Sequence, residues 1–371
     1  MRTTRRRGLR LILPALVGGG MALSLIACSA PEAPASSITG FQERDAEHLP
    51  DDWDDVVAAA LEEGEVILYS NQSQEVSSAT IDAFAKAFPG IEVKVVRDSV
   101  DTLPNRFVQE YESTGDSPAD VLESSIFEPV IADNPEWFVN IREMDPSIIP
   151  TLGDFPLDQA APEHRPRSIT SAAYTWTLAY NTDRVTEDEL PETWEDLTDP
   201  KWKGRVMVAD PRSASAYFAF HALMYESYGA AFGQGLLAND ATLSESGASL
   251  SQQVAAGAFD IGGPVARSHS AQIREQGAPV EHLDLLPAKV SATTMALPAN
   301  PPHPNAQRVL AAFLLSAQAQ EIQCTIGQLG TLNAKAEGDC DAFHIDPSLE
   351  VFDLNIPQSV KDPVLDAMDL N

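Results

Sequence analysis

The sequence is poor in cysteine and in positive charge, and it lacks the short motifs of several enzyme classes. Three cysteines occur in 371 residues, and 24 lysines and arginines stand against 55 aspartates and glutamates. There is no G-x-S-x-G elbow, H-E-x-x-H, P-loop or G-x-G-x-x-G followed by a helix. The seven histidines have no metal-ligand spacing. We therefore expect no enzymatic activity, no cofactor and no bound metal.

The acidity limits the partners of the chain. The formal net charge of −31 becomes −36 once the five arginines among the first ten residues are removed. Such a surface repels nucleic acid and anionic lipid headgroups, so we expect no nucleic-acid partner. An excess of carboxylates is typical of a solvated surface, and a preference for cationic ligands is the alternative.

The N-terminus resembles an export signal. An apolar stretch over residues 11–27 follows the arginines and is broken by Pro14 and by glycines at 18–20. A transmembrane anchor, the alternative, needs about 20 uninterrupted apolar residues. Leu25-Ile26-Ala27-Cys28 resembles the lipobox of bacterial lipoproteins, in which the cysteine becomes the lipid-bearing first residue. We expect a signal peptide over 1–27 and lipidation at Cys28, with the twin-arginine and the general export route both open.

The residues after Cys28 predict a tether. The stretch 28–61 begins with a run rich in Ala, Pro, Ser and Glu without apolar periodicity, which cannot bury enough surface to fold.

The two cysteines left after lipidation are Cys324 and Cys340. In an exported protein such a pair predicts a disulfide, and two buried free thiols are the alternative.

Two α/β sets are predicted in the remaining residues, which number roughly 320 and suffice for two domains. The first set has strands at 65–70, 91–95 and 119–122 with helices at 75–88 and 103–112. This βαβαβ order predicts a parallel sheet. The second set has strands at 175–180, 205–208, 259–261 and 280–285 with helices at 215–228 and 250–257. A strand at 291–297 and a helix at 305–322 then return to the first set, which implies two lobes.

Several motifs in order give a more specific resemblance. They are Tyr69-Ser70-Asn71-Gln72, Ser117-Pro118-Ala119-Asp120-Val121, Leu178-Ala179-Tyr180-Asn181-Thr182, Asp199-Pro200-Lys201-Trp202-Lys203-Gly204-Arg205 and His303-Pro304-Asn305-Ala306. Together they resemble the ferric-iron-binding branch of type 2 periplasmic binding proteins, over about residues 64–335. The resemblance implies an α/β clamshell of two lobes joined by crossover strands, near 168–181 and 286–297.

The resemblance also implies boundaries and partners. Lobe 1 would span 62–170 and 288–322, lobe 2 would span 171–287, and the C-terminal segment 323–371 would pack on lobe 2. A protein of this kind captures a small-molecule ligand outside the cytoplasm and delivers it to an ABC permease. We expect a monomer that meets the membrane through its lipid anchor.

The cleft residues depart from an iron site. The positions that match the family's iron ligands are Ser73, Ser125, Arg267 and Ser268. Because a guanidinium stays protonated and cannot ligate a metal, the set favours an anion such as a phosphonate, phosphate or carboxylate. The alternative for Arg267 is a solvated arginine at a helix start.

A second anion signal follows the strand at 205–208. There Asp210-Pro211-Arg212-Ser213-Ala214-Ser215-Ala216 opens a helix, whose free N–H groups favour an anion. In the family this loop holds the ligand's anionic group, which assigns Ser213, Ala214 and Ser215 to the site. A serine that only caps the helix is the alternative.

Aromatic and acidic residues near the expected hinge complete the candidates. Tyr174, Trp176 and Tyr217 could flank a flat or cationic ligand, or simply pack. Glu123 follows the third strand and could meet an ammonium group, which would suit a zwitterion. A ferric-complex or polyamine binder of the same class, and an exported hydrolase, are the alternative functions.

Overall fold

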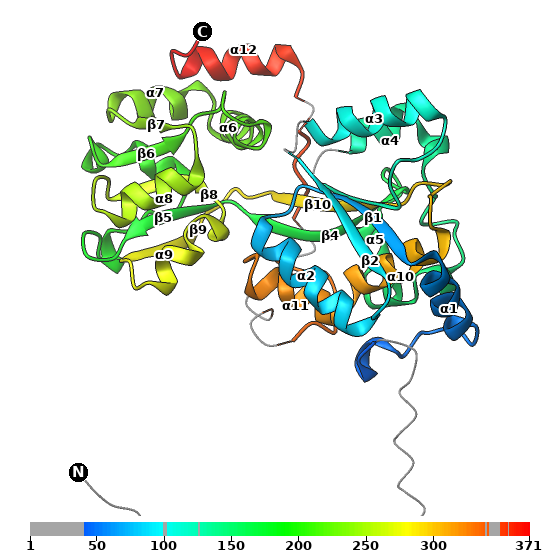
Figure 1. Cartoon of the computed structure of the whole chain (residues 1–371). Coiled ribbons are helices and arrows are strands. Elements are labelled where there is room, and N and C mark those ends of the chain that lie inside the picture. The colour runs from blue at the N-terminus through cyan, green and yellow to red at the C-terminus, as the bar shows by residue number, and fades with distance from the viewer. Residues whose placement is uncertain (1–40, 99–101, 125–126, 338–339, 341–348, 355) are drawn as a thin grey trace, which may run out of the picture. The chain divides into compact units, whose positions relative to one another are not determined.

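The computed structural model describes residues 41–98, 102–124, 127–337, 340, 349–354 and 356–371. They form a mixed α/β fold with two five-stranded sheets, each with helices around it (Figure 1). No helix in these ranges is both long and apolar enough to cross a bilayer. The predicted signal peptide, Cys28 and Ser125 lie outside the described residues.

The first sheet has the order β2-β1-β3-β10-β4. Its strands are β1 (Glu65–Ser70), β2 (Glu92–Arg97), β3 (Val121–Ser124), β4 (Ser168–Thr175) and β10 (Val290–Ala296). β1 pairs in parallel with both β2 and β3, as the βαβαβ pattern predicts. β10 runs antiparallel between β3 and β4 and brings the chain back to this sheet.

The second sheet has the order β7-β6-β8-β5-β9. Its strands are β5 (Thr177–Asn181), β6 (Val206–Ala209), β7 (Thr242–Ser244), β8 (Ile261–Val265) and β9 (Val280–Asp284). β6 is parallel to its neighbours β7 and β8, whereas β5 is antiparallel to β8 and β9. We call the parts built on the first and second sheets lobe 1 and lobe 2.

Among the described residues, two connections lead directly from a strand of one sheet to a strand of the other. β4 of the first sheet continues into β5 of the second with Trp176 as the one residue between them. The second connection runs from β9 to β10 over residues 285–289. The predicted crossover strands and the two-lobed α/β class are therefore confirmed.

The helices of lobe 1 are α1 (Trp53–Glu63), α2 (Gln74–Ala87), α3 (Thr102–Thr114), α4 (Glu128–Asp133), α5 (Leu157–Ala160), α10 (Pro304–Leu315) and α11 (Ala317–Thr325). They include those predicted at 75–88, 103–112 and 305–322, whereas α1, α4 and α5 were not predicted. The predicted helix at 305–322 is two helices, because Ser316 is extended and its hydroxyl accepts from the Ala319 N–H at the start of α11.

The predicted flexible tether extends too far toward the C-terminus, because α1 begins inside it. α1 begins within the stretch 28–61 and packs against α10, with Trp53, Val56 and Val57 buried. Its apolar residues recur at helical spacing after the Pro-rich run has ended, and burying them offsets the cost of ordering the segment. Gly64 ends the helix in a left-handed conformation (φ 74°).

The helices of lobe 2 surround the second sheet, with the C-terminal one as an outer helix. They are α6 (Ser215–Tyr228), α7 (Ala230–Ala238), α8 (Gly247–Ala255), α9 (Ala271–Glu275) and the C-terminal α12 (Gln358–Ala367). α12 packs on α6 and α7 (Figure 1), where Val364, Ala367 and Met368 are buried. Gly233 of α7 makes this approach possible, since a Cβ there would lie 2.8 Å from the Ala367 carbonyl oxygen.

Short 3-10 helices complete the elements. They are η1 (Glu43–Asp45), η2 (Pro135–Trp137), η3 (Pro146–Ile148), η4 (Pro150–Asp154), η5 (Glu187–Glu189), η6 (Trp194–Thr198), η7 (Pro200–Trp202) and η8 (Arg267–His269).

Some residues of the sequence motifs described above stabilise the fold through hydrogen bonds to backbone groups. The buried Asp120 accepts the Ile67 N–H (2.7 Å) and the His303 N–H (2.7 Å) and pairs with His303 Nδ1 (2.9 Å). Glu63 accepts the N–H groups of Asn305 and Ala306 at the start of α10. These carboxylates satisfy backbone donors that burial would otherwise leave unpaired.

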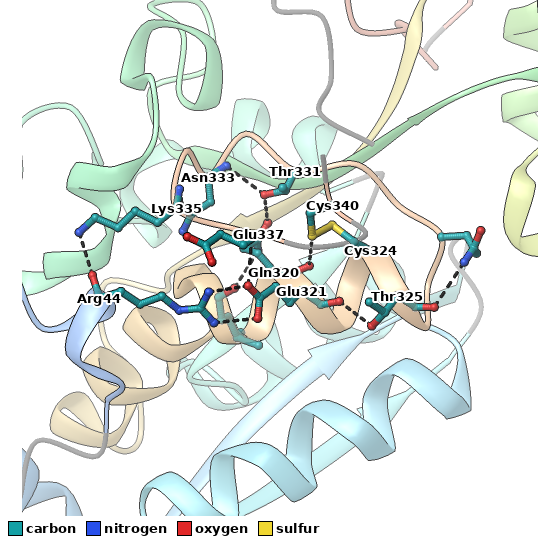
Figure 2. The surroundings of a disulfide bond; sticks show 12 residues. Arg44, Gln320, Glu321, Cys324, Thr325, Thr331, Asn333, Lys335, Glu337 and Cys340 are labelled. Carbon is teal, nitrogen blue, oxygen red and sulfur yellow. Dashed lines mark hydrogen bonds and ion pairs between the residues drawn. A yellow bond between two sulfur atoms is a disulfide. The ribbon is translucent and has the colours of Figure 1, made fainter. Parts of the chain in front are cut away.

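The predicted disulfide between Cys324 and Cys340 is present, and both residues are fully buried (Figure 2). It closes a loop between α11 and the C-terminal segment. Lys335, in this loop, donates to the Arg44 carbonyl oxygen (2.9 Å), and Arg44 pairs with Glu321 of α11 (2.6 Å). The loop thus fastens the segment that precedes α1 to lobe 1.

Candidate functional site

The polar candidates of each lobe lie after strands, or in the case of Glu123 near the end of one, at one edge of a sheet. β6 and β8 are parallel neighbours, so Ser213 to Ser215 after β6 and Arg267 after β8 lie at the same edge. β1 and β3 are likewise parallel, which places Ser73 and Glu123 at the matching edge of the first sheet. The carboxyl edge of parallel strands is where α/β folds bind ligands.

The start of α6 offers free donors. Ala214 is its N-cap residue and supplies no side-chain hydrogen bond, so no oxygen of the described residues caps the first N–H groups of the helix. Ser213 and Ser215 are exposed on either side of it. The turn before them is rigid, because Asp210 accepts the Arg212 N–H (2.8 Å) and its backbone oxygen accepts the Ser213 hydroxyl (2.8 Å).

Arg267 has a carboxylate partner. It begins η8, its side chain is half-buried, and its Nη2 pairs with Asp284 of β9. A guanidinium has five donors, so this pair leaves others for an anion. The neighbouring Ser268 is exposed. An anion at Arg267 would therefore share the cation with Asp284, rather than meet a free charge.

The aromatic candidates form a packed cluster at the hinge. The Trp176 ring lies 5.1 Å from Tyr174 and 5.3 Å from Tyr217 between centroids. Trp176 is 5% exposed, and its buried Nε1 has no hydrogen-bond partner in the described part of the chain. The Tyr217 hydroxyl accepts the Gly247 N–H at the start of α8 (2.8 Å). The cluster therefore joins the crossover to two helices of lobe 2, which is a packing role in this structure.

His269 is a residue of this cluster that the sequence prediction missed. Its ring lies 6.4 Å from Trp176, and its Nδ1 accepts the Ala266 N–H (3.2 Å), which leaves Nε2 as the donor of the neutral ring. Burial lowers the pKa of His269 to about 4, so the ring is neutral at pH 7. Its place two residues after Arg267, past the end of β8, is the sequence signal that could have identified it.

His282 of β9 lies between two buried hydroxyl groups, those of Thr177 and Ser270. Its Nδ1 lies 2.8 Å from the Thr177 hydroxyl, and its Nε2 pairs with the Ser270 hydroxyl. Burial, followed by the charges of Arg267 and Arg274, lowers the pKa of His282 to about 3. A neutral imidazole between two hydroxyls connects β9, β5 and η8.

In lobe 1 the two described candidates have different surroundings. Ser73 is exposed, and its hydroxyl accepts the Val76 N–H (3.3 Å) as the N-cap of α2. Glu123 instead is 3% exposed and accepts from the Ser70 hydroxyl (3.2 Å) inside the lobe. Among the described residues, no hydrogen bond or ion pair joins these two to the lobe 2 candidates. Nor do these residues hold a cluster of three or more His, Cys, Asp or Glu side chains suited to a metal.

A family model for bacterial extracellular solute-binding proteins matches residues 154–341. A protein of Serratia marcescens named as an Fe(3+)-binding periplasmic protein is 30% identical over 171 residues, which cover 45% of this chain and 46% of the relative. The chain thus spans less than half of that relative's length.

Two solved structures share the fold. The substrate-binding protein of an ABC transporter from Agrobacterium tumefaciens is 18% identical, with a TM-score of 0.64 and coverage of 84% of this chain and 96% of that one. The periplasmic binding protein AfuA of Actinobacillus pleuropneumoniae, with fructose-6-phosphate bound, is 19% identical, with a TM-score of 0.61 and coverage of 83% and 99%. At these identities the likeness concerns the fold alone.

Proposed function

We propose that this chain, which belongs to the family of bacterial extracellular solute-binding proteins, captures a small anionic or zwitterionic solute and delivers it to the membrane permease of an ABC importer. The solute is a phosphonate, an organic phosphate or a carboxylate. It binds between the two lobes, and the protein acts as a carrier rather than as an enzyme.

The uncapped start of α6 is the observation that carries the choice of an anion. Its free N–H groups, the exposed Ser215 hydroxyl and the donors of Arg267 lie at one sheet edge. Ser213 lies beside them, and its hydroxyl must turn away from the Asp210 carbonyl oxygen to donate to an anion. A desolvated anion needs several such donors to offset the loss of water. Ser73 would complete the site from lobe 1, together with Ser125.

The alternative ligands of the same class fit these residues less well. Fe(III) needs anionic oxygen ligands, and three serines and an arginine occupy the positions that match the family's iron ligands. A polyamine would need carboxylates in place of Arg267 and the α6 N-terminus. An exported hydrolase would need a nucleophile and a base, and the sequence has neither a G-x-S-x-G nor an H-E-x-x-H motif to supply them.

We place the protein outside the cytoplasm, tethered by lipid at Cys28. The prediction is that Cys28→Ala moves the protein from the membrane fraction to the soluble fraction. A matched Ser29→Ala variant should stay with the membrane. Unchanged membrane retention of Cys28→Ala would refute the anchor.

Calorimetry on Arg267 variants tests the anion site. With the solute that co-purifies, Arg267→Ala should weaken binding more than about thirtyfold, because a buried anion loses its charge-assisted contacts. Arg267→Lys should recover part of the affinity, since it keeps the charge but not the planar fork. Arg274→Ala is the control, as Arg274 also pairs with a carboxylate of β9, Glu281. Equal affinity of wild type and Arg267→Ala would exclude the site.

A further inference from the structure

Lobe 1 contains a pocket with polar and apolar walls, separate from the anion site of lobe 2. Its polar lining residues are Ser70, Gln72, Ser77, Thr80, Glu123 and Gln323. They come from the ends of β1 and β3 and from α2 and α11, two helices that pack side by side (Figure 1). Leu68, Phe84 and Leu310 line the apolar part.

Glu123 is a carboxyl group without a cationic partner in this pocket. None of the ion pairs among the described residues includes it, and its side chain accepts from the Ser70 hydroxyl. No other lining residue of β1, α2, α10 or α11 is ionisable. Arg97 of β2 approaches from outside, where its Nε donates to the Gln72 carbonyl oxygen (2.7 Å). A buried carboxylate in such a place must be protonated or meet a cation.

Two hydroxyl groups of α2 face the same pocket without partners. Ser77 is 8% exposed and Thr80 is 6% exposed, and the oxygen of each is buried and makes no hydrogen bond to any residue that the structure describes. Gln323 adds an amide oxygen, which accepts from Gln72 Nε2 (3.2 Å) and has a second lone pair. The pocket therefore presents one carboxylate and several neutral oxygens.

We infer that this pocket of lobe 1 binds a small monovalent cation, either an inorganic ion or a primary ammonium group, with Glu123 as the charged ligand and Ser70, Ser77 and Thr80 as neutral oxygen ligands. Hard cations prefer oxygen ligands of this kind. The cation neutralises the carboxylate and occupies the lone pairs of the two unpartnered hydroxyls. Burial raises the pKa of Glu123, so protons compete with the cation for the same oxygen atoms.

Thermal unfolding in different chloride salts tests this inference. At pH 8 and constant ionic strength, NaCl, KCl, NH4Cl and methylammonium chloride are each compared with choline chloride, whose cation is too large for the pocket. At about ten times the dissociation constant a bound cation should raise the Tm by about 3 °C. The rise should shrink as the pH is lowered, because protons compete with the cation for the Glu123 oxygen atoms. A response to Na⁺ or K⁺ identifies an inorganic ion, and a response to methylammonium alone identifies an ammonium group.

Variants locate the effect. Glu123→Gln, which is neutral and nearly isosteric, should abolish the cation-specific rise, and Thr80→Val should reduce it even if Glu123→Gln folds poorly. Glu62→Gln, at an exposed position of α1, should respond as wild type does. Equal Tm values of wild type in all five salts, or a full response of Glu123→Gln, would overturn the inference. Anion binding by lobe 2 is measured separately and does not depend on the outcome.

Discussion

At the scale of single residues, burial decides protonation in lobe 2. His221 of α6 is buried, and its Nε2 donates to the Ala209 carbonyl oxygen (2.8 Å). Burial lowers the pKa of His221 to about 4, below the value of about 6.5 of an unfolded histidine. The sequence could not reveal this, because a histidine among Phe218, Phe220 and Leu223 fits either face of the helix.

This shift predicts a loss of stability in mild acid. Between pH 6.5 and 4 the unfolded state binds a proton that folded His221 does not, so the free energy of unfolding falls as the pH falls. At pH 5.5 the loss is about 1.4 kcal/mol for this residue. Urea unfolding at pH 7.5 and 5.5 should show a pH effect smaller by that amount in His221→Gln than in wild type. His164→Gln, at an exposed position, should keep the wild-type difference. Identical pH effects in all three proteins would disprove the prediction.

Gly247 packs closely against two side chains of the aromatic cluster, those of His269 and Tyr217. A Cβ at this position would lie 2.1 Å from His269 Nδ1 and 2.7 Å from the Tyr217 hydroxyl. Tyr217 is buried and His269 is half-buried against Trp176, so neither ring can move away without opening the cluster.

We therefore expect Gly247→Ala to lower the free energy of unfolding by about 2 kcal/mol or more. Denaturant titration measures it. Gly153→Ala is the control, since its new Cβ would meet the half-exposed His48 ring at 3.1 Å, which can turn away. Similar stabilities of the two variants would show that the cluster adapts.

At the scale of elements, the sequence predicted those with strong local signals. Alternation and helical spacing located β1, α2, β2, α3 and α6 to within a few residues. The sequence pattern did not reveal α1, whose apolar residues follow a polar, Pro-rich stretch. Nor did it reveal α12, which is stable because it packs on α6 and α7. For Ser73, neither the hydrogen bond that it accepts from the Val76 N–H nor its exposure could be predicted, because both depend on where β1 ends.

The disulfide is the element-scale feature with the clearest consequence. It joins α11 to Cys340 across a sequence separation of 16 residues. Closing a loop of this length stabilises a fold by about 3 kcal/mol in the chain-entropy model. The double variant Cys324→Ala/Cys340→Ala should lose about that much in urea unfolding, and dithiothreitol should reproduce the loss in wild type. The double variant itself should not respond to dithiothreitol, and a wild-type midpoint in it would contradict the stabilising role.

At the scale of the whole molecule, the order of motifs predicted the two lobes and their crossovers. The joint spacing of motifs from Tyr69 to Ala306 carried that prediction, since each motif alone is short. The identity of the ligand could not be predicted in the same way, because proteins that share a fold bind unrelated ligands. Arg267 illustrates the limit: its pairing with Asp284 depends on β9 lying beside β5 and cannot be inferred from local sequence.

The identity of the bound solute tests the central claim most directly. Native mass spectrometry of the protein, purified without added ligand, followed by analysis of the released compound, gives both stoichiometry and chemistry. We predict one solute per chain, bearing a phosphonate, phosphate or carboxylate group, and loss of that solute in Arg267→Ala. Stoichiometric Fe(III), a polyamine without an anionic group, or no binding in a panel of these three anion classes would contradict the account.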